Sequence, residues 1–341
     1  MTDKVGMGIV GCGYWGPNLI RNFSSLPDCS VRFACDADPG RLKHIQGVYP
    51  NLGVTTEVQD LLDKPDIHAV TIATPVWTHY DLAKAALAAG KHVLIEKPMA
   101  STSAQCRELI DIAAEKALTL MIGHTYIYSA PIRKIKEIVD SGDIGELLYI
   151  SSQRLNLGLF QKDINVAWDL APHDISIMLY ITGSAPLAVN CQGRSHINKG
   201  VEDVTNMSLN FRNGGFATIQ TSWLDPNKVR RMTFVGNRRM ILFDDNEPNE
   251  KIRVYDKRVT VPPHYDTFAE FHYSYHYGDI YSPYVNQVEP LKTECQHFLD
   301  CIRMGSLPLT SGLQGLQVVQ VLEAASESLK NNGARIEIES I

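Results

Sequence analysis

The sequence predicts an α/β fold in which a doubly wound parallel sheet is followed by a second, α+β domain. Three observations support this prediction. The length of 341 residues suits two domains at about 100–200 residues each. Short apolar runs alternate with helical patterns over the first 125 residues, as in parallel sheets covered on both faces. Beyond residue 145, β-rich runs follow one another with short turns between them, which is typical of an antiparallel or mixed sheet.

The first part of the chain contains five runs with the character of buried strands and five amphipathic stretches. The strands are expected at Val5–Val10, Ser30–Cys35, His68–Ala73, His92–Ile95 and Thr119–Ile122. The helices are expected at Trp15–Leu26, Pro39–Gln46, Thr78–Ala89, Ser103–Lys116 and Pro131–Asp140. Each of the first four helices connects two strands that would then run in parallel, and the last leads into turns at Gly142 and Gly145.

The second part changes to alternating or β-rich patterns. Strands are expected at residues 146–157, 187–196, 203–211, 215–224, 229–235 and 240–244. Helices are expected at Asp169–Ile181, Pro290–Met304 and Ser311–Asn331. This change of pattern predicts a cofactor-binding domain over residues 1–124 and a substrate-binding and oligomerisation domain over residues 125–341.

Composition excludes several classes of protein. Lys and Arg number 32 against 38 Asp and Glu, a net charge of −6, whereas a nucleic-acid binder would carry a basic face. No apolar run reaches the roughly 18–20 residues that cross a bilayer, so we expect no membrane partner. The first residues lack the pattern of a signal peptide, and we expect a cytoplasmic protein.

The seven cysteines indicate neither disulfides nor a metal site. Their number is odd, and no C-x-x-C pair occurs. In a cytoplasmic protein such cysteines are expected to be reduced and to pack as small hydrophobic side chains. We therefore predict no bound metal.

A glycine motif follows the first predicted strand. Gly11, Gly13 and Gly16 form G-x-G-x-x-G, with Tyr14 and Trp15 between the last two glycines. In this context the first glycine permits a tight turn, the second lets a pyrophosphate approach, and the third allows the helix to contact the strand. The pyrophosphate then lies at the helix N-terminus, which favours negative charge. The motif therefore predicts a dinucleotide cofactor.

An acidic residue at the end of the second predicted strand supports this prediction. Asp36 stands 20 positions after Gly16, the spacing at which a carboxylate meets the ribose hydroxyls. Its charge would repel a 2′-phosphate, so NAD is favoured over NADP. Arg41 lies near enough to weaken this preference without reversing it.

Two further motifs carry residues suited to acid–base chemistry. Glu96-Lys97-Pro98 follows a buried strand, and the carboxyl ends of such strands face the ligand crevice. Lys97 could there hydrogen-bond a substrate hydroxyl, although the same three residues could also form a surface turn. Asp169 and His173 are four apart, so on a helix both face one side. They could be a base with its orienting partner, half of a metal site, or a polar pair without catalytic function, and metal is the weakest of these.

Taken together, these motifs resemble the Gfo/Idh/MocA oxidoreductases. The resemblance rests on the glycine motif, Thr74-Pro75 with His79, Glu96-Lys97-Pro98 and the later Asp-x-x-x-His, and it extends over essentially the whole chain. It implies an N-terminal Rossmann domain, a C-terminal domain with an open, predominantly antiparallel sheet, an active site between them, and assembly as a homodimer or homotetramer.

The resemblance also implies roles for individual residues. Lys97 would contact substrate and nicotinamide, His173 would accept the proton of the hydroxyl being oxidised, and Asp169 would be its partner. The implied cofactor contacts are Thr74, Pro75, His79 and Glu96. The chain departs from many relatives before the aspartate, where Asn165-Val166-Ala167-Trp168 replaces a glycine run.

The substrate class is expected to be a sugar. The sequence around Trp15 and Trp168 resembles the branch that acts on nucleotide sugars, which implies oxidation of a UDP-GlcNAc-like hexose at C3. Tyr126, Arg154 and Asn156 are the predicted additional substrate contacts, although the last two would equally suit a surface strand. A dehydrogenase of a free sugar, glucoside or inositol, or a catalytically silent NAD-binding regulator, remains an alternative.

The segment His264–Tyr284 is rich in histidine and tyrosine. His272 and His276 have a spacing that metal ligands can use, but no carboxylate or thiol stands at ligand spacing. Tyrosines suit both sugar stacking and subunit interfaces. We expect an interface, with at most one residue reaching the substrate.

Overall fold

The computed structural model describes residues 4–212, 214–260 and 274–339. Within these ranges the chain forms two compact units. The first contains residues up to Ser129 together with Val288–Glu323, and the second contains Ala130–Gln287 and the residues from Ala324 onward. The domain boundary predicted at residue 124 assigns cofactor binding to one part and substrate binding to the other, and this assignment of roles stays a prediction. In the packing itself, a C-terminal segment joins the N-terminal unit.

The first unit is built on a six-stranded sheet in the order β3-β2-β1-β4-β5-β6. Every pair of neighbouring strands is parallel. The order reverses between β1 and β4, and ligands of such sheets bind beyond the carboxyl ends of the strands at this point. The strands are β1 (Val5–Val10), β2 (Cys29–Cys35), β3 (Gly53–Thr55), β4 (Ala69–Ile72), β5 (His92–Glu96) and β6 (Leu120–Gly123).

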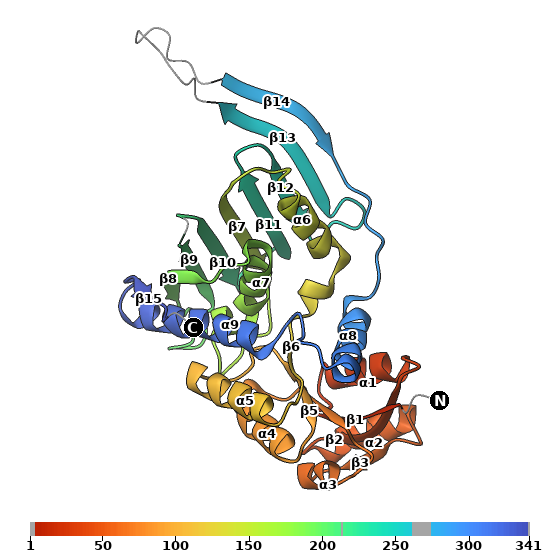
Figure 1. Cartoon of the computed structure of the whole chain (residues 1–341). Helices are drawn as coiled ribbons and strands as arrows, with labels where there is room; N and C mark the ends of the chain where they lie inside the picture. The colour runs from red at the N-terminus through yellow and green to blue at the C-terminus, as the bar shows by residue number, and fades with distance from the viewer. Residues whose placement is uncertain (1–3, 213, 261–273, 340–341) are drawn as a thin grey trace, which may run out of the picture. The chain divides into compact units, whose positions relative to one another are not determined.

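Helices pack against this sheet through their apolar sides. α1 contacts β1, β2 and α8, while α4 contacts β4, β5 and α5 (Figure 1). Every residue of β1, β4 and β6 is buried, which explains why the sequences of these strands are almost continuously apolar. The helices are α1 (Gly16–Ser24), α2 (Pro39–Val48), α3 (Val58–Leu62), α4 (Val76–Ala88), α5 (Ser103–Glu115), the 3₁₀ helix η1 (Thr125–Tyr128) and α8 (Pro290–Met304).

The second unit is built on a nine-stranded sheet in the order β14-β13-β12-β11-β7-β10-β9-β8-β15. All neighbours are antiparallel except β7 and β10. The predicted fold class is thus confirmed in both units. The strands are β7 (Leu147–Leu155), β8 (Pro186–Arg194), β9 (Val204–Phe211), β10 (Phe216–Ser222), β11 (Val229–Gly236), β12 (Met240–Asp244), β13 (Ile252–Thr260), β14 (Ser274–Tyr281) and β15 (Ile336–Glu337).

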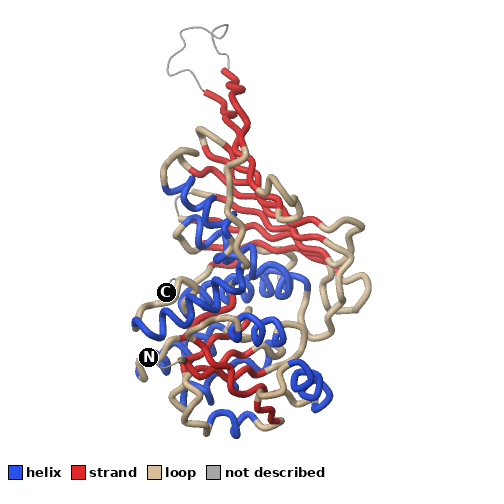
Figure 2. Tube along the Cα trace, turned by 90° about the vertical axis from the view of Figure 1, so that its right-hand side faces the viewer, coloured by secondary structure: helices blue, strands red, loops and turns tan. Residues whose placement is uncertain are grey.

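Helices α6 (Ala130–Asp140) and α7 (Val166–Thr182) pack together, and α7 also packs on β7, β9 and β10. Strands β13 and β14 pair as a hairpin that extends beyond the other strands of this sheet (Figure 2). The long helix α9 (Gly312–Lys330) contributes residues to both units. Among the described residues, no helix has the length and apolar character that a membrane span requires.

The seven cysteines all lie within the described ranges, and all are free and buried. Burial raises the pKa of Cys12 and of Cys106 to about 12. A thiol with a raised pKa remains protonated and unreactive. This agrees with the prediction that the cysteines serve as small packing side chains.

Candidate active-site residues

The glycine loop after β1 has the geometry that the motif predicts. Gly11 has φ +95°, and a Cβ there would lie 2.5 Å from the carbonyl oxygen of Ala73. A Cβ on Gly16 would collide with the carbonyl oxygen of Gly11. Both positions therefore require glycine for the chain to turn tightly from β1 into α1.

Gly13 differs from these two glycines because packing does not require it. A Cβ built there meets only the Arg41 guanidinium, at 3.6 Å. The space above Gly13 is thus open to a ligand that approaches the backbone closely. This fits the expected pyrophosphate of a dinucleotide, and the loop leads directly into the N-terminus of α1. Beside Gly13, Tyr14 is 88% exposed and packs edge-on against Trp15.

Asp36 at the end of β2 supports the same loop. Its Oδ2 accepts a hydrogen bond from the Cys12 N–H at 2.7 Å, and its Oδ1 accepts one from the Asp38 N–H at 2.8 Å. The Arg41 guanidinium lies 3.4 Å from Oδ2. The carboxylate is therefore fixed beside the glycine loop, where a ribose is expected, and the cation beside it is largely exposed.

His79 connects two of the predicted cofactor segments. Its imidazole is buried, with Nε2 2.8 Å from the Thr74 carbonyl oxygen and Nδ1 2.8 Å from the Pro98 carbonyl oxygen. Burial lowers the pKa of His79, so the ring is neutral near pH 7 and donates to one carbonyl at a time. His79 thus holds the Thr74-Pro75 turn near the segment that follows Lys97.

Lys97 follows directly after β5, and its side chain is half-buried. The neighbouring Glu96 turns into the interior, where burial raises the pKa of its carboxyl to about 7. The first unit therefore brings the glycine loop, Asp36, the Thr74 turn and Lys97 to the carboxyl ends of β1, β2, β4 and β5. This is the edge at which ligands bind to such sheets.

In the second unit, Asp169 lies in the first turn of α7 and His173 one turn later. The side chain of Asn165 caps this helix by accepting from the Trp168 N–H at 3.1 Å. A carboxylate in the first turn is favoured by the helix dipole. Pro172 lies between the two residues in this helix and lacks the N–H that would bond to the Trp168 carbonyl. The helix thus places Asp169 and His173 on one face, as predicted.

Trp223 is a residue of this site that the sequence did not indicate. It follows β10 and is 1% exposed, and its indole Nε1 donates to Asp169 Oδ2 at 3.0 Å. The ring also packs edge-on against Phe160 at 5.8 Å between centroids. Because this contact joins residues 54 positions apart, only the folded chain reveals that Trp223 orients Asp169.

The structure changes the prediction for Arg154. Its guanidinium is buried and binds the Asp174 carboxylate through two hydrogen bonds, of 2.8 Å and 3.0 Å. Arg154 therefore fixes α7 against β7 rather than forming part of a surface strand. A guanidinium held in this way is engaged with a protein carboxylate, which the sequence alone did not show. The carboxylate partner of Arg154 is Asp174, five positions after Asp169, and the sequence did not indicate this pairing.

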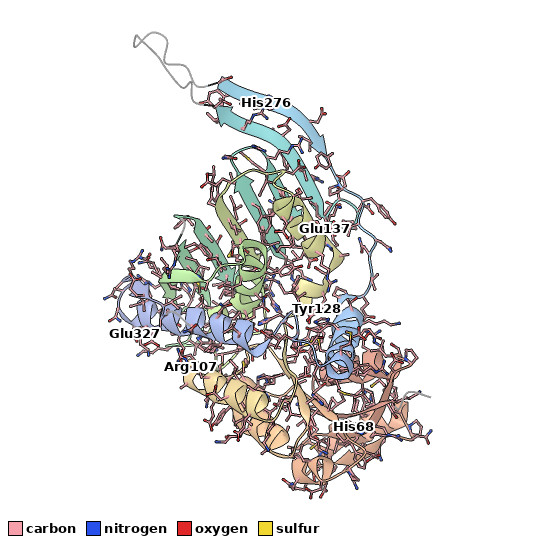
Figure 3. All side chains as sticks on the ribbon, in the orientation of Figure 1. His68, Arg107, Tyr128, Glu137, His276 and Glu327 are labelled. Carbon is pink, nitrogen blue, oxygen red and sulfur yellow. The ribbon has the colours of Figure 1, made fainter. Side chains whose placement is uncertain are left out.

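The remaining predicted residues lie in several places. Asn156 follows β7 and is half-buried, with its backbone N–H bonded to the Ser222 carbonyl. Tyr126 lies on η1 in the first unit and is also half-buried. His276 on β14 pairs with Asp256 at 2.9 Å (Figure 3), while His264 and His272 fall outside the described residues. Among the described residues no group of three or more metal-ligating side chains occurs.

The second unit also contains a cavity of about 490 Å³. Its lining includes neutral polar side chains of β7, β8, β9 and β10, among them Gln153, Gln192 and Gln220, together with apolar ones such as Met207 and Ile219. None of the predicted site residues lines it. We therefore attach no chemistry to this cavity.

Comparisons with known proteins decide the family. Residues 5–124 match the model of an oxidoreductase family with an NAD-binding Rossmann fold, and residues 132–242 match the GFO/IDH/MocA C-terminal domain. The two matches together cover more than half of the chain. This chain belongs to the Gfo/Idh/MocA oxidoreductase family. It is thus an NAD(P)-binding oxidoreductase, and the relatives of this family include sugar and inositol dehydrogenases.

Individual relatives are similar at low identity. An uncharacterized oxidoreductase of Bacillus subtilis, YrbE, is 26% identical over 96% of this chain and 95% of its own length. A UDP-N-acetylglucosamine 3-dehydrogenase of Acidithiobacillus ferrooxidans is 31% identical over 58% of this chain and 61% of its own. The solved structure of a levoglucosan dehydrogenase with NADH covers 99% of this chain and 100% of that one, at a TM-score of 0.84 and 21% identity. The last shows a shared fold.

Proposed function

We propose that this oxidoreductase is an NAD-dependent sugar dehydrogenase that oxidises a nucleotide-linked hexose, of the UDP-GlcNAc type, at C3 to the 3-keto sugar. Lys97, Asp169 and His173 are the proposed catalytic residues. The observation that carries the proposal is the Asp169–His173 pair on one face of α7, with Asp169 fixed by Trp223. An acid–histidine pair of this kind suits proton removal from a hydroxyl.

In this proposal His173 accepts the proton of the substrate hydroxyl. Histidine is the side chain that most often serves as a general base in enzymes. Asp169, held by Trp223, orients the imidazole and stabilises its charged form. Bound nicotinamide would supply the hydride acceptor for the carbinol carbon. Lys97 donates a hydrogen bond to the hydroxyl oxygen and stabilises its developing negative charge.

The proposed substrate class draws on the 31% identical UDP-N-acetylglucosamine 3-dehydrogenase. A second candidate is a free sugar, glucoside or inositol, and the pairing of Arg154 favours it. A diphosphate requires cations or helix N-termini, whereas the Arg154 guanidinium is committed to Asp174. The similarity in fold to levoglucosan dehydrogenase is compatible with this candidate.

Two measurements separate these candidates. Reduction of NAD is followed at the nicotinamide absorbance band with UDP-GlcNAc, glucose, a glucoside and inositol as substrates. Binding of UDP alone is measured by calorimetry. The nucleotide-sugar proposal predicts NAD reduction with UDP-GlcNAc and binding of UDP. Reduction only by free sugars, with no UDP binding, would move the assignment to the second candidate. If none of these compounds reduces NAD, a catalytically silent NAD-binding regulator is the remaining candidate.

We also propose NAD rather than NADP as the cofactor. Asp36→Asn keeps an oxygen to accept from the Cys12 N–H but removes the negative charge. We expect NAD to bind about ten-fold more weakly and NADP about ten-fold more tightly, since each factor corresponds to about 1.4 kcal/mol. Fluorescence titration with both cofactors checks this result. The control is Asp38→Asn, an exposed residue that caps α2, and an equal change in both variants would argue against selection by Asp36.

Finally, we propose that the chain forms a homo-oligomer through the hairpin of β13 and β14. Most described side chains of β14 are exposed, including Tyr275 at 62% and Tyr277 at 74%. Residues 257–260 of β13 pair with β14 and not with β12, and a stretch of only two strands is marginally stable in water. Aromatic residues are enriched at interfaces. Sedimentation velocity on the wild type and on Tyr277→Ser checks this: a wild-type monomer would contradict it.

A further inference from the structure

The first unit buries three titratable side chains near the carboxyl ends of β5 and β6. Glu96 is the last residue of β5, His124 follows β6, and Glu294 lies on α8. Their exposed fractions are 8%, 1% and 0%. None of the three has a role in the proton transfer proposed above. Buried groups of this kind are rare unless they are paired or functional.

The two carboxyl groups converge on the short segment from Gly123 to Thr125. Glu96 pairs in register with Gly123, and a Cβ on Gly123 would lie 3.1 Å from both Cδ and Oε2 of Glu96. Glu294 approaches from α8, and its Oε2 accepts a hydrogen bond from Thr125 Oγ1 at 2.9 Å. The absence of a side chain at Gly123 leaves the room that the Glu96 carboxyl occupies.

Several polar atoms in this cluster lack a hydrogen-bond partner among the described residues. They are Oε1 of Glu294 and both ring nitrogens of His124. Each buried polar group left unsatisfied costs about 1–3 kcal/mol. A core selected for stability alone would place apolar side chains here. Local violations of this kind are expected at functional sites.

The charges of the cluster follow from burial and from Lys97. Burial raises the pKa of Glu294 well above its usual range, and the charge of Glu96 raises it further. Burial raises the pKa of Glu96 to about 7, although the neighbouring Lys97 charge opposes the rise. Burial, with Lys97 as the second cause, lowers the pKa of His124 to about 3. Burial thus favours the uncharged forms of His124 and Glu294, whereas the Lys97 charge favours the charged form of Glu96.

We propose that Glu96 and Glu294 form a buried acid pair that retains one proton, and that Glu96 supplies the single negative charge that balances Lys97. Glu96 is then a positioning residue: it acts through Lys97 by holding the ammonium in its charged state. Glu294 remains protonated. The link to catalysis rests on the proposed function, whereas the charge distribution within the pair does not.

The other titratable groups around the pair do not supply a competing charge. Tyr128 on η1 (Figure 3) is buried. Its hydroxyl lies 2.9 Å from Thr310 Oγ1, and burial raises its pKa beyond the physiological range. Burial likewise raises the pKa of Cys295 on α8, next to Glu294, and that of Cys29. These groups are all neutral at pH 8, and the positive charge that lowers the pKa of Glu96 is that of Lys97.

The experiment measures the pKa of Lys97 directly. An amine-reactive reagent labels the protein at a series of pH values, and mass spectrometry follows the rate at Lys97. In Glu96→Gln we expect the pKa of Lys97 to fall by about one unit, because an opposite charge at this range shifts a pKa by about 1–3 units. In Glu294→Gln, which replaces a neutral acid by a neutral amide, we expect a pKa within about 0.3 units of the wild type. The matched control is Glu108→Gln, an exposed carboxylate paired with Lys84.

Two results would overturn the proposal. One is an unchanged pKa of Lys97 in Glu96→Gln, and the other is an equal fall in both variants, which would place the charge on Glu294. Infrared spectroscopy adds a readout that needs no lysine chemistry: the band of a buried carboxylic acid is expected at pH 8 in the wild type and is lost in Glu294→Gln. Absence of this band in the wild type would equally contradict the proposal.

These readouts separate the acid pair from the proposed function. Labelling and infrared spectra need no turnover, so a protein that oxidised no sugar could still show the predicted shifts. If sugar is oxidised, the pH profile of kcat in Glu96→Gln should shift in the same direction as the pKa of Lys97. Folding of this variant is expected above neutral pH. Because burial raises the pKa of Glu96 to about 7 in the folded state, the protonated carboxyl stabilises the fold below about pH 4.5, and this stabilisation is lost as pH rises through about 7. Glutamine does not titrate, so the variant does not lose stability in this way.

Discussion

Replacing Lys97 by methionine is expected to lower turnover about 10²–10³-fold, while NAD still binds. A donor aimed at the developing oxyanion contributes this much to catalysis. The glycine loop and Asp36, which are expected to hold the cofactor, make their own contacts. Steady-state kinetics and cofactor titration of the variant test both parts.

The control for this variant is Lys84→Met. Lys84 is an exposed lysine on α4 that pairs with Glu108 at 2.6 Å, and its replacement should leave turnover unchanged. Turnover of the Lys97 variant equal to that of the wild type would remove Lys97 from the mechanism. Loss of NAD binding in the same variant would instead assign Lys97 to the cofactor site.

Replacing Arg154 by alanine is expected to destabilise the protein by about 3–5 kcal/mol. The change leaves the Asp174 carboxylate buried and without its bidentate partner, and removing one member of a buried pair costs this much. Because the pair joins β7 to α7, the Asp169–His173 face should also lose its fixed position, and turnover should fall. Urea denaturation gives the free energy of unfolding.

Two further variants show whether the buried pair is the cause. The double change Arg154→Met with Asp174→Leu should recover most of the lost stability, since apolar residues of similar volume often replace such pairs without cost. Arg253→Ala removes an exposed pair with Glu250 and should cost less than about 1 kcal/mol. Equal losses in Arg154→Ala and Arg253→Ala would contradict the role given to the buried pair.

Local sequence signals predicted the parts of the fold that depend on them. The strand Val5–Val10 and the helix Pro290–Met304 occur with the predicted ends, because an apolar run or a helical stripe defines each within one segment. The short strand Gly53–Thr55 and helix Val58–Leu62 were not predicted. Three or five residues are too few to establish a period.

The site residues that could be predicted likewise depend on signals within one segment of the chain. The glycine motif and Asp36 were predictable because the turn and the following strand lie within one βαβ unit. The contact of Trp223 with Asp169 and the pairing of Arg154 with Asp174 depend on strands and helices that meet only in the folded unit. A cation on a strand has the same sequence signal whether it faces a ligand or a buried carboxylate.

Glu294 shows why a buried acid is difficult to recognise from sequence. It stands between Leu291 and Phe298 on an amphipathic helix, where a glutamate normally faces solvent. Only the packing of α8 against η1 turns its carboxyl toward Thr125 and the interior. The apolar pattern of α8 predicted where the helix begins and ends. The residue that its buried carboxyl contacts, Thr125, lies 169 positions earlier in the chain.

In the proposed reaction a hydride passes from C3 of a sugar to NAD. The most direct test of this step is incubation of the wild-type protein with NAD and UDP-GlcNAc deuterated at C3, followed by mass spectrometry of the nicotinamide product. We expect deuterium in the reduced cofactor and a 3-keto sugar, with both formed about 10²–10³-fold more slowly by Lys97→Met. Reduced cofactor without deuterium would place the oxidation at another carbon, and no reduction by this or any sugar of the panel would contradict the proposed reaction.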